Sequence, residues 1–93
     1  MTRVVNIKHE RCDVYIGRPS NWGNPYRLKR EEDRAAVISM YIVWLLRHPA
    51  LLKRVGELKG KVLGCHCHPR LCHGDVLRAL ANGVAPDCVD LFI

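Results

Sequence analysis

The segment Gly64–Asp75 reads GCHCHPRLCHGD, and it decides how the rest of the chain is arranged. Residues from Lys61 to Cys67 are expected to be extended, and Pro69 then ends that strand. A helix is predicted from Asp75 to Ala81, ended by Asn82-Gly83. The segment is therefore predicted to be a turn that leads from a strand into a helix.

The chain before this turn predicts two further strands and two helices. The β-branched runs Val4–Ile7 and Val14–Ile16 are typical of strands. Apolar residues at three- and four-residue spacing predict a helix from Glu31 to His48, and Pro49 begins a second, short helix. The tail from Cys88 to Ile93 is expected to add a final strand or to pack as a loop.

This order predicts a single α/β domain over residues 1–93. It is a small, three-layer-like domain with three helices and a short, mostly parallel sheet of three to four strands. The second strand and the strand at Lys61–Cys67 are joined through helices, so they should be parallel. A core this small makes a homodimer a reasonable expectation.

Composition limits the partners and the compartment. The formal charge of +6 favours polyanionic or phosphorylated partners, nucleic acid among them. Several basic residues, Arg34 included, are interpreted as solvated residues at the ends of elements. The longest apolar run, Val37–Leu46, is too short to span a bilayer, so no membrane partner is expected. Five cysteines without a secretion signal indicate a cytoplasmic protein and no disulfide framework.

In the leading interpretation the Cys/His turn is an anion site. Free N–H groups at the start of the last helix suit a phosphate, Gly74 lets the ligand approach the backbone, and Arg70 lies over its charge. A cysteine at the helix start, Cys72, is expected to have a lowered pKa and can act as a nucleophile, and Cys67 is expected among the ligand-binding residues. His73 and Asp75 are then the candidate proton carriers.

Two alternatives stay open at this turn. Strand alternation puts Cys65 and Cys67 on one face and His66 on the other. Zinc could be bound by three thiolates and one imidazole, although the spacing is uncommon and adjacent ligands strain a tetrahedron. The residues of that set are Cys65, Cys67, Cys72 and His73. Alternatively, Cys65 is simply a small core residue.

The loop from Gly17 to Pro25 contains the second group of candidate ligand-binding residues. Arg18, held in a Gly-Arg-Pro bend, and Ser20 suit a phosphate or carboxylate. Trp22 could flank a base or cover the core. The amide of Asn24 could point into the site or cap a turn.

Parallel sheets bind ligands beyond the carboxyl ends of their strands, and both irregular segments leave strands at that end. A pocket between GRPSNWGNP and CHCHPRLCHGD is therefore expected to bind, and to process if it is an enzyme, a phosphorylated nucleotide-like ligand. No cofactor is required for binding. The alternative is a zinc-stabilised module that binds nucleic acid or protein.

The chain resembles an uncharacterised family of phages and bacteria, the domain of unknown function numbered 4326. The resemblance lies in VYIGRPS (14–20), WGNP (22–25), LKGK (58–61), LGC (63–65), Cys67, Pro69 and CHGDVL (72–77). The family often has an aromatic residue between the two cysteines, where this chain has His66, which adds a candidate ligand. The resemblance implies a phage or prophage setting, in the cytoplasm of a bacterial host, and brings no established activity.

Overall fold

A computed structural model describes residues 1–92, with side chains as far as Val89. Within this range, two strands come first, four helical segments follow, and a third strand precedes the last two helical segments. Their bounds are β1 Arg3–Asn6, β2 Val14–Tyr15, η1 Glu31–Asp33, α1 Arg34–Leu46, α2 Pro49–Lys53, η2 Arg54–Leu58, β3 Val62–Cys65, α3 His73–Ala81 and η3 Pro86–Phe92. The α/β class, the three helices and the three-stranded parallel sheet agree with the prediction.

The tail differs from the sequence expectation. Cys88–Ile93 was expected to form a strand or a loop, but Pro86–Phe92 forms a 3₁₀ helix that packs against α3 and α1. Pro86 suits a first helical position because its missing N–H has no helical partner there. Ile93 lies outside the described residues.

The sheet has the strand order β1–β3–β2, and both pairs are parallel. In the register, Leu63 of β3 lies between Val4 of β1 and Val14 of β2. Because paired residues of parallel strands share a face, these three side chains point to one side of the sheet. That side is the apolar one, since Leu63 is fully buried and Val4 nearly so.

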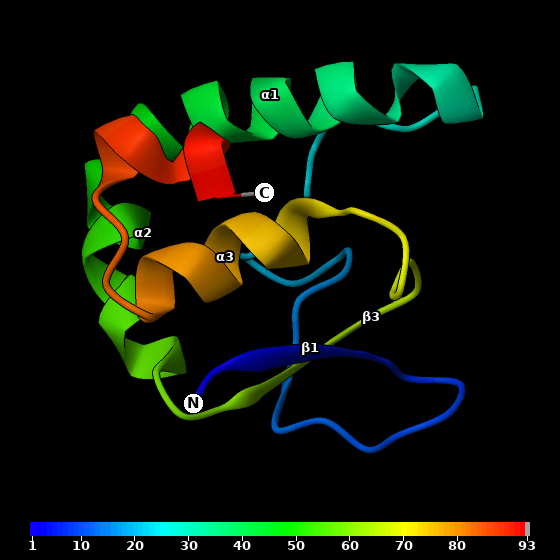
Figure 1. Cartoon of the computed structure of the whole chain (residues 1–93), viewed down its shortest axis with the longest axis horizontal. Helices are drawn as coiled ribbons and strands as arrows, with labels where there is room; N and C mark the ends of the chain where they lie inside the picture. Colours follow the sequence, from blue (N-terminus) through cyan, green and yellow to red (C-terminus); the bar gives the residue numbers. More distant parts are fainter. Residues whose placement is uncertain (93) are drawn as a thin grey trace.

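The elements stack in layers, with the sheet, α3 and α1 following one another (Figure 1). Helix α3 lies on the sheet through Val76 and Leu77, both fully buried. Helix α1 contributes Tyr41 and Leu45 to the same core. The core therefore lies between the sheet and two crossing helices, and the carboxyl ends of β2 and β3 remain at one edge.

The opposite face of the sheet is covered by the segment after β1. A Cβ on Gly64 would lie 2.5 Å from Cys12 Sγ and 2.6 Å from Ile7 Cγ2. Such a distance is far below van der Waals contact, so only glycine fits at this point of β3. Close approach of the segment lets a chain this short cover both faces of its sheet.

Among the described residues, no single helix is long and apolar enough to cross a membrane. The sharply bent pair Glu31–Leu46 and Pro49–Leu58 meets that test only when taken together.

Candidate functional site

A pocket of about 350 Å³ lies where the loop after β2, the turn after β3 and the first turns of α1 and α3 meet. The parallel sheet thus brings the two irregular segments to one place. The pocket is lined by Tyr15, Gly17, Arg18, Asn24, Tyr26, Leu28, Arg34, Val37, Ile38, Cys65, His66, Cys67, Cys72 and His73.

Cys72 is the N-cap of α3. Its thiol accepts a hydrogen bond from the Gly74 N–H at 3.3 Å, and its own N–H donates to Asp75 Oδ2 at 2.9 Å. This reciprocal arrangement is a capping box with a thiol in place of the usual hydroxyl. Two backbone N–H groups at the N-terminus of α3, those of Cys72 and Gly74, are therefore already bonded to side chains of the same helix start.

Three thiols meet at this helix start. Cys72 Sγ lies 3.6 Å from Cys65 Sγ, and Cys67 lines the same pocket as these two cysteines. Cys65 and Cys72 are buried, whereas Cys67 is half-buried and lines the pocket. All three cysteines line the pocket, and Cys67 is the most exposed of them.

The surroundings of Cys67 favour its thiolate. The Cys72 thiol donates a hydrogen bond and Arg34 adds a second one and a positive charge, which lowers the pKa of Cys67 to about 5. The neighbouring thiols Cys65 and Cys67 and burial raise the pKa of Cys72. The hydrogen bond from Cys72 also lowers the pKa of Cys65 to about 6, so the proton stays on Cys72 and both of its neighbours gain thiolate character.

The interpretation of Arg34 as a solvated basic residue is wrong. Its side chain is only 16% exposed, ion-pairs with Glu31 and donates from Nη1 to Leu71 O at 2.8 Å. The contact to Glu31 raises the pKa of the guanidinium further. A signal existed in the sequence, since Arg34 lies four residues before Ile38 and so on the core face of α1.

His73 is buried at the back of the pocket. Its Nε2 donates to Ile16 O at 2.7 Å, and its ring meets Tyr41 edge to face with 5.1 Å between centroids. Burial lowers the pKa of His73, which keeps the imidazole neutral. With the proton fixed on Nε2, Nδ1 is the acceptor, and this is the state a general base requires.

Arg18 and Asn24 both line the pocket, as expected. Arg18 Nη1 donates to Asn24 O at 2.9 Å, which orients the guanidinium. Asn24 Oδ1 accepts from the Tyr26 N–H at 2.9 Å and its Nδ2 donates to Val37 O at 3.4 Å. Its amide therefore caps a turn, which is the second of the two roles expected for Asn24, and it also joins the loop to α1.

Two loop residues lie away from the pocket. Trp22 is buried in the core, with 6% of its surface exposed, and its carbonyl accepts from Tyr41 Oη at 2.8 Å. Ser20 Oγ accepts from the Trp22 N–H at 3.3 Å and so closes a turn. Neither residue lines the pocket, and Trp22 covers the core, which is the second of the two roles expected for it.

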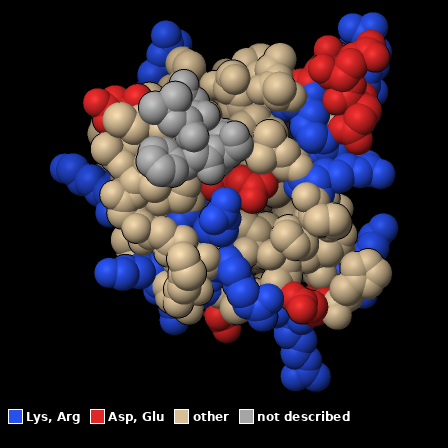
Figure 2. Space-filling model, viewed as in Figure 1, with Lys and Arg blue, Asp and Glu red and all other residues tan. Residues whose placement is uncertain are grey.

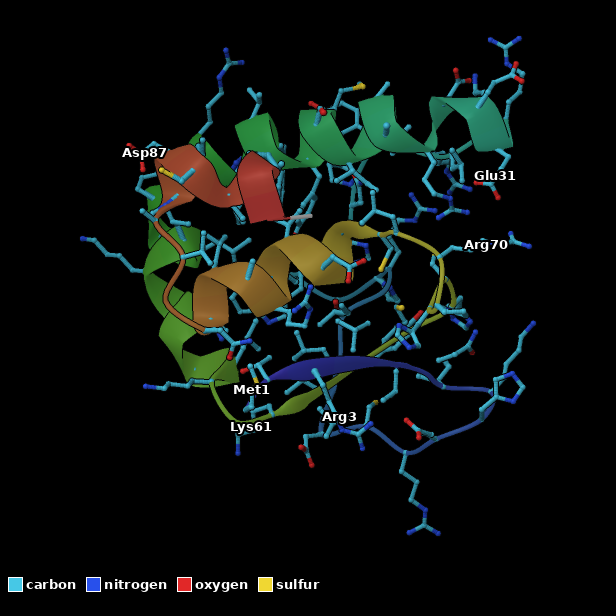
Figure 3. The ribbon with its side chains drawn as sticks, viewed as in Figure 1. Met1, Arg3, Glu31, Lys61, Arg70 and Asp87 are labelled. Atoms are coloured by element: carbon cyan, nitrogen blue, oxygen red, sulfur yellow. The ribbon has the colours of Figure 1, made fainter. Side chains whose placement is uncertain are left out.

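Three residues of the Cys/His turn also have other roles. A Cβ on Gly74 would lie 2.8 Å from Ile16 Cδ1, so this glycine permits close packing on the sheet rather than ligand approach. Asp75 is engaged in the capping box and faces Arg78 at 3.7 Å. Arg70 is 70% exposed and pairs with Glu31 at 3.2 Å, outside the pocket lining (Figure 3).

Tyr15 and His66 were not expected together in the lining. Tyr15 Oη donates to Arg18 O at 3.2 Å and lies 3.0 Å from His66 Nε2. His66 lines the same pocket as Cys65 and Cys67, because β3 ends at Cys65 and the alternation of faces expected for His66 and Cys67 does not continue beyond it. Tyr26 and Leu28, each exposed by more than a third, add apolar surface to the lining.

The set predicted for zinc is not arranged as a metal site. No group of three or more His, Cys, Asp or Glu side chains in the described part of the chain could hold a metal ion. The Nε2 atom of His73 is bonded to Ile16 O, and Cys72 Sγ accepts from a backbone N–H. These two atoms of the predicted set are therefore engaged by other groups of the protein.

Comparison with known proteins gives one family and viral relatives. The family described as "Domain of unknown function (DUF4326)" matches residues 2–83. An uncharacterised 12.4 kDa protein of Enterobacteria phage T4, from the nrdA-td intergenic region, is 33% identical over 94% of this chain and 83% of its own length. Uncharacterised protein R718 of Acanthamoeba polyphaga mimivirus is 31% identical over 73% of this chain and 65% of its own. No solved structure matches.

Proposed function

The chain belongs to the DUF4326 family, and we propose that it binds a phosphorylated, nucleotide-like ligand in the pocket between residues 17–25 and 64–75. The observation that carries the proposal is Arg18. Its guanidinium lines the pocket, and among the described side chains it makes no ion pair with a carboxylate. A fixed, uncompensated guanidinium in a concave site favours a phosphate or carboxylate.

The rest of the pocket suits the remainder of such a ligand. A volume of about 350 Å³ lies within the range of small-molecule sites, roughly 300–1,000 Å³. Tyr26 and Leu28 offer exposed apolar surface on which a planar base can stack. The hydroxyl of Tyr15 and the ring of His66 add polar groups that can fix an orientation.

The family members in viruses favour action in the cytoplasm of an infected cell. Turnover of the ligand would use His73 Nδ1 as the base and Cys67 as the nucleophile, in place of Cys72 and Asp75. The zinc-stabilised nucleic-acid module has no comparable support. On the face seen in Figure 2, lysines and arginines lie at the edge and near the centre, interspersed with acidic and uncharged residues, rather than in one patch.

Thermal unfolding of the reduced protein with a panel of nucleoside mono-, di- and triphosphates tests the proposal. A ligand at a hundred times its Kd stabilises the fold by about 2.7 kcal/mol. Arg18→Ala should abolish this stabilisation, whereas Arg47→Ala, an exposed arginine outside the pocket lining with the same loss of charge, should retain it. If no nucleotide stabilises the wild-type protein, the proposal is wrong.

A further inference from the structure

We propose that Cys65 and Cys72 form a dithiol that hydrogen peroxide, entering through the pocket, oxidises to a reversible intramolecular disulfide. The new bond joins the end of β3 to the start of α3. The oxidation consumes a peroxide and needs no nucleotide, so this inference and the proposed function stand or fall separately.

The two sulfurs are already in contact. Cys72 Sγ lies 3.6 Å from Cys65 Sγ, and one of the two thiols donates a hydrogen bond to the other. A disulfide bond is about 2.0 Å long, so the sulfurs have to approach each other by about 1.6 Å. Closure of a disulfide needs a partner sulfur within reach, and this pair meets that condition.

The approach falls to Cys72, because Cys65 is held in the sheet. The carbonyl of Cys65, at the end of β3, accepts from the Ile7 N–H at 3.0 Å. Cys72 instead follows residues 66–71, which form neither helix nor strand. To reach Cys65, its thiol has to leave the Gly74 N–H, which is 3.3 Å away, and a thiol sulfur is only a weak acceptor.

The size of the oxidant follows from access. Both cysteines belong to the lining of the pocket, but only 1% of the surface of Cys65 and 3% of that of Cys72 are exposed. A molecule as small as hydrogen peroxide can reach sulfurs buried to this degree, whereas a bulky oxidant meets the side chains around them first. The pair is therefore expected to select a small peroxide.

The reaction balances as a two-electron oxidation by one peroxide. The hydrogen bond from Cys72 lowers the pKa of Cys65 to about 6, so Cys65 is the thiolate that attacks. Cys65 Sγ attacks one oxygen, the O–O bond breaks, and a sulfenic acid forms while the released hydroxide takes up a solvent proton. Cys72 Sγ then attacks the Cys65 sulfur, the S–O bond breaks, and the departing hydroxide takes the Cys72 proton. The two thiols lose two electrons, and the peroxide becomes two waters.

The experiment treats the reduced chain with a limited amount of hydrogen peroxide, alkylates the remaining thiols and maps the tryptic peptides. Trypsin cuts the chain so that Cys72 lies on residues 71–78, and Cys65 lies with Cys67 on residues 62–70. Fragmentation of the joined peptides then identifies the cysteine of residues 62–70 that carries the bond. The wild type should lose two hydrogens and give a Cys65–Cys72 linkage, which dithiothreitol removes.

Two variants test the roles of the thiols. Cys67→Ser is the matched control, because it removes the most exposed thiol of the pocket and should still form the linkage. When Cys72→Ser is added to Cys67→Ser, no second thiol remains beside Cys65, so dimedone should trap the Cys65 sulfenic acid. Serine at position 72 retains a capping hydroxyl.

The size of the oxidant is tested with tert-butyl hydroperoxide, which undergoes the same chemistry but is bulkier. Each rate of linkage formation is divided by the rate at which the same peroxide oxidises free N-acetylcysteine. The normalised rate should be lower for tert-butyl hydroperoxide, and equal normalised rates would overturn the assignment of a small oxidant.

Three results would overturn the proposal itself. They are a wild type without a linkage after peroxide, a linkage through Cys67, and loss of the linkage in Cys67→Ser. Peptide mapping of the wild type needs no variant, so the test does not depend on whether the serine variants fold. Nucleotide binding is measured on the reduced protein and is read independently.

Discussion

Replacement of Tyr41 by Phe measures the contribution of one hydrogen bond between α1 and the Gly17–Pro25 loop to the free energy of unfolding. Tyr41 is fully buried and its hydroxyl donates to Trp22 O at 2.8 Å. The ring stays in place in Tyr41→Phe, but the carbonyl loses its donor in a region that water does not reach. A buried polar group left without a partner costs about 1–3 kcal/mol, so we expect a loss of about 1–2 kcal/mol. For a chain this short, that lowers the Tm by about 4–16 °C.

Urea unfolding measures this loss, with the midpoint falling and the m-value unchanged. The matched control is Tyr26→Phe. This substitution also removes one tyrosine hydroxyl, but from a side chain that is 37% exposed. That control should change the unfolding free energy by less than about 0.5 kcal/mol. If Tyr41→Phe falls in the same small range as the control, the hydrogen bond does not hold the loop and the reasoning fails.

Three further expectations can be measured directly. Gly64→Ala should destabilise by about 1–3 kcal/mol in urea, because its Cβ would meet Cys12 and Ile7 within 2.7 Å, while Gly56→Ala, which meets nothing within 4 Å, should be neutral. Arg34→Gln should shift the pH profile of Cys67 alkylation upward, since the guanidinium stabilises the thiolate, and an unshifted profile beside exposed Arg30→Gln would contradict this. Stability should fall on acidification from about pH 8 to about pH 5. Burial lowers the pKa of His73, so on acidification this histidine binds a proton in the unfolded chain before it does so in the folded chain. His73→Gln should therefore make stability less dependent on pH over this range.

Much of the fold follows from local signals in the sequence. The β-branched runs predict β1 and β2, and the parallel arrangement follows because helices separate β2 from β3. The start of α3 is predicted to within a residue or two, since Pro69 ends the strand and Cys72–Asp75 supplies the cap. The same rule that fixes parallel strands brings both irregular segments to one edge.

The lining of the pocket could not be predicted as well, because spacing gives a residue's place along the chain and not the neighbour it packs against. Trp22 and Gly74 have the composition of ligand-binding residues, yet both pack inward against the core. Arg34 looks like a solvated residue, yet it turns toward Leu71 O and the Cys67 thiol. Such choices depend on tertiary packing that only the assembled layers define.

The position of β3 has a consequence for synthesis on the ribosome. Strands β1 and β2 do not pair with each other; each pairs only with β3, which is completed at Cys65. While the earlier residues emerge, neither strand has a partner, so the nascent chain carries two open edges until about two thirds of it has been translated. The sheet therefore forms when β3, its last strand, pairs with β1 on one side and β2 on the other. Every backbone pairing in the sheet is consequently non-local and forms late in synthesis.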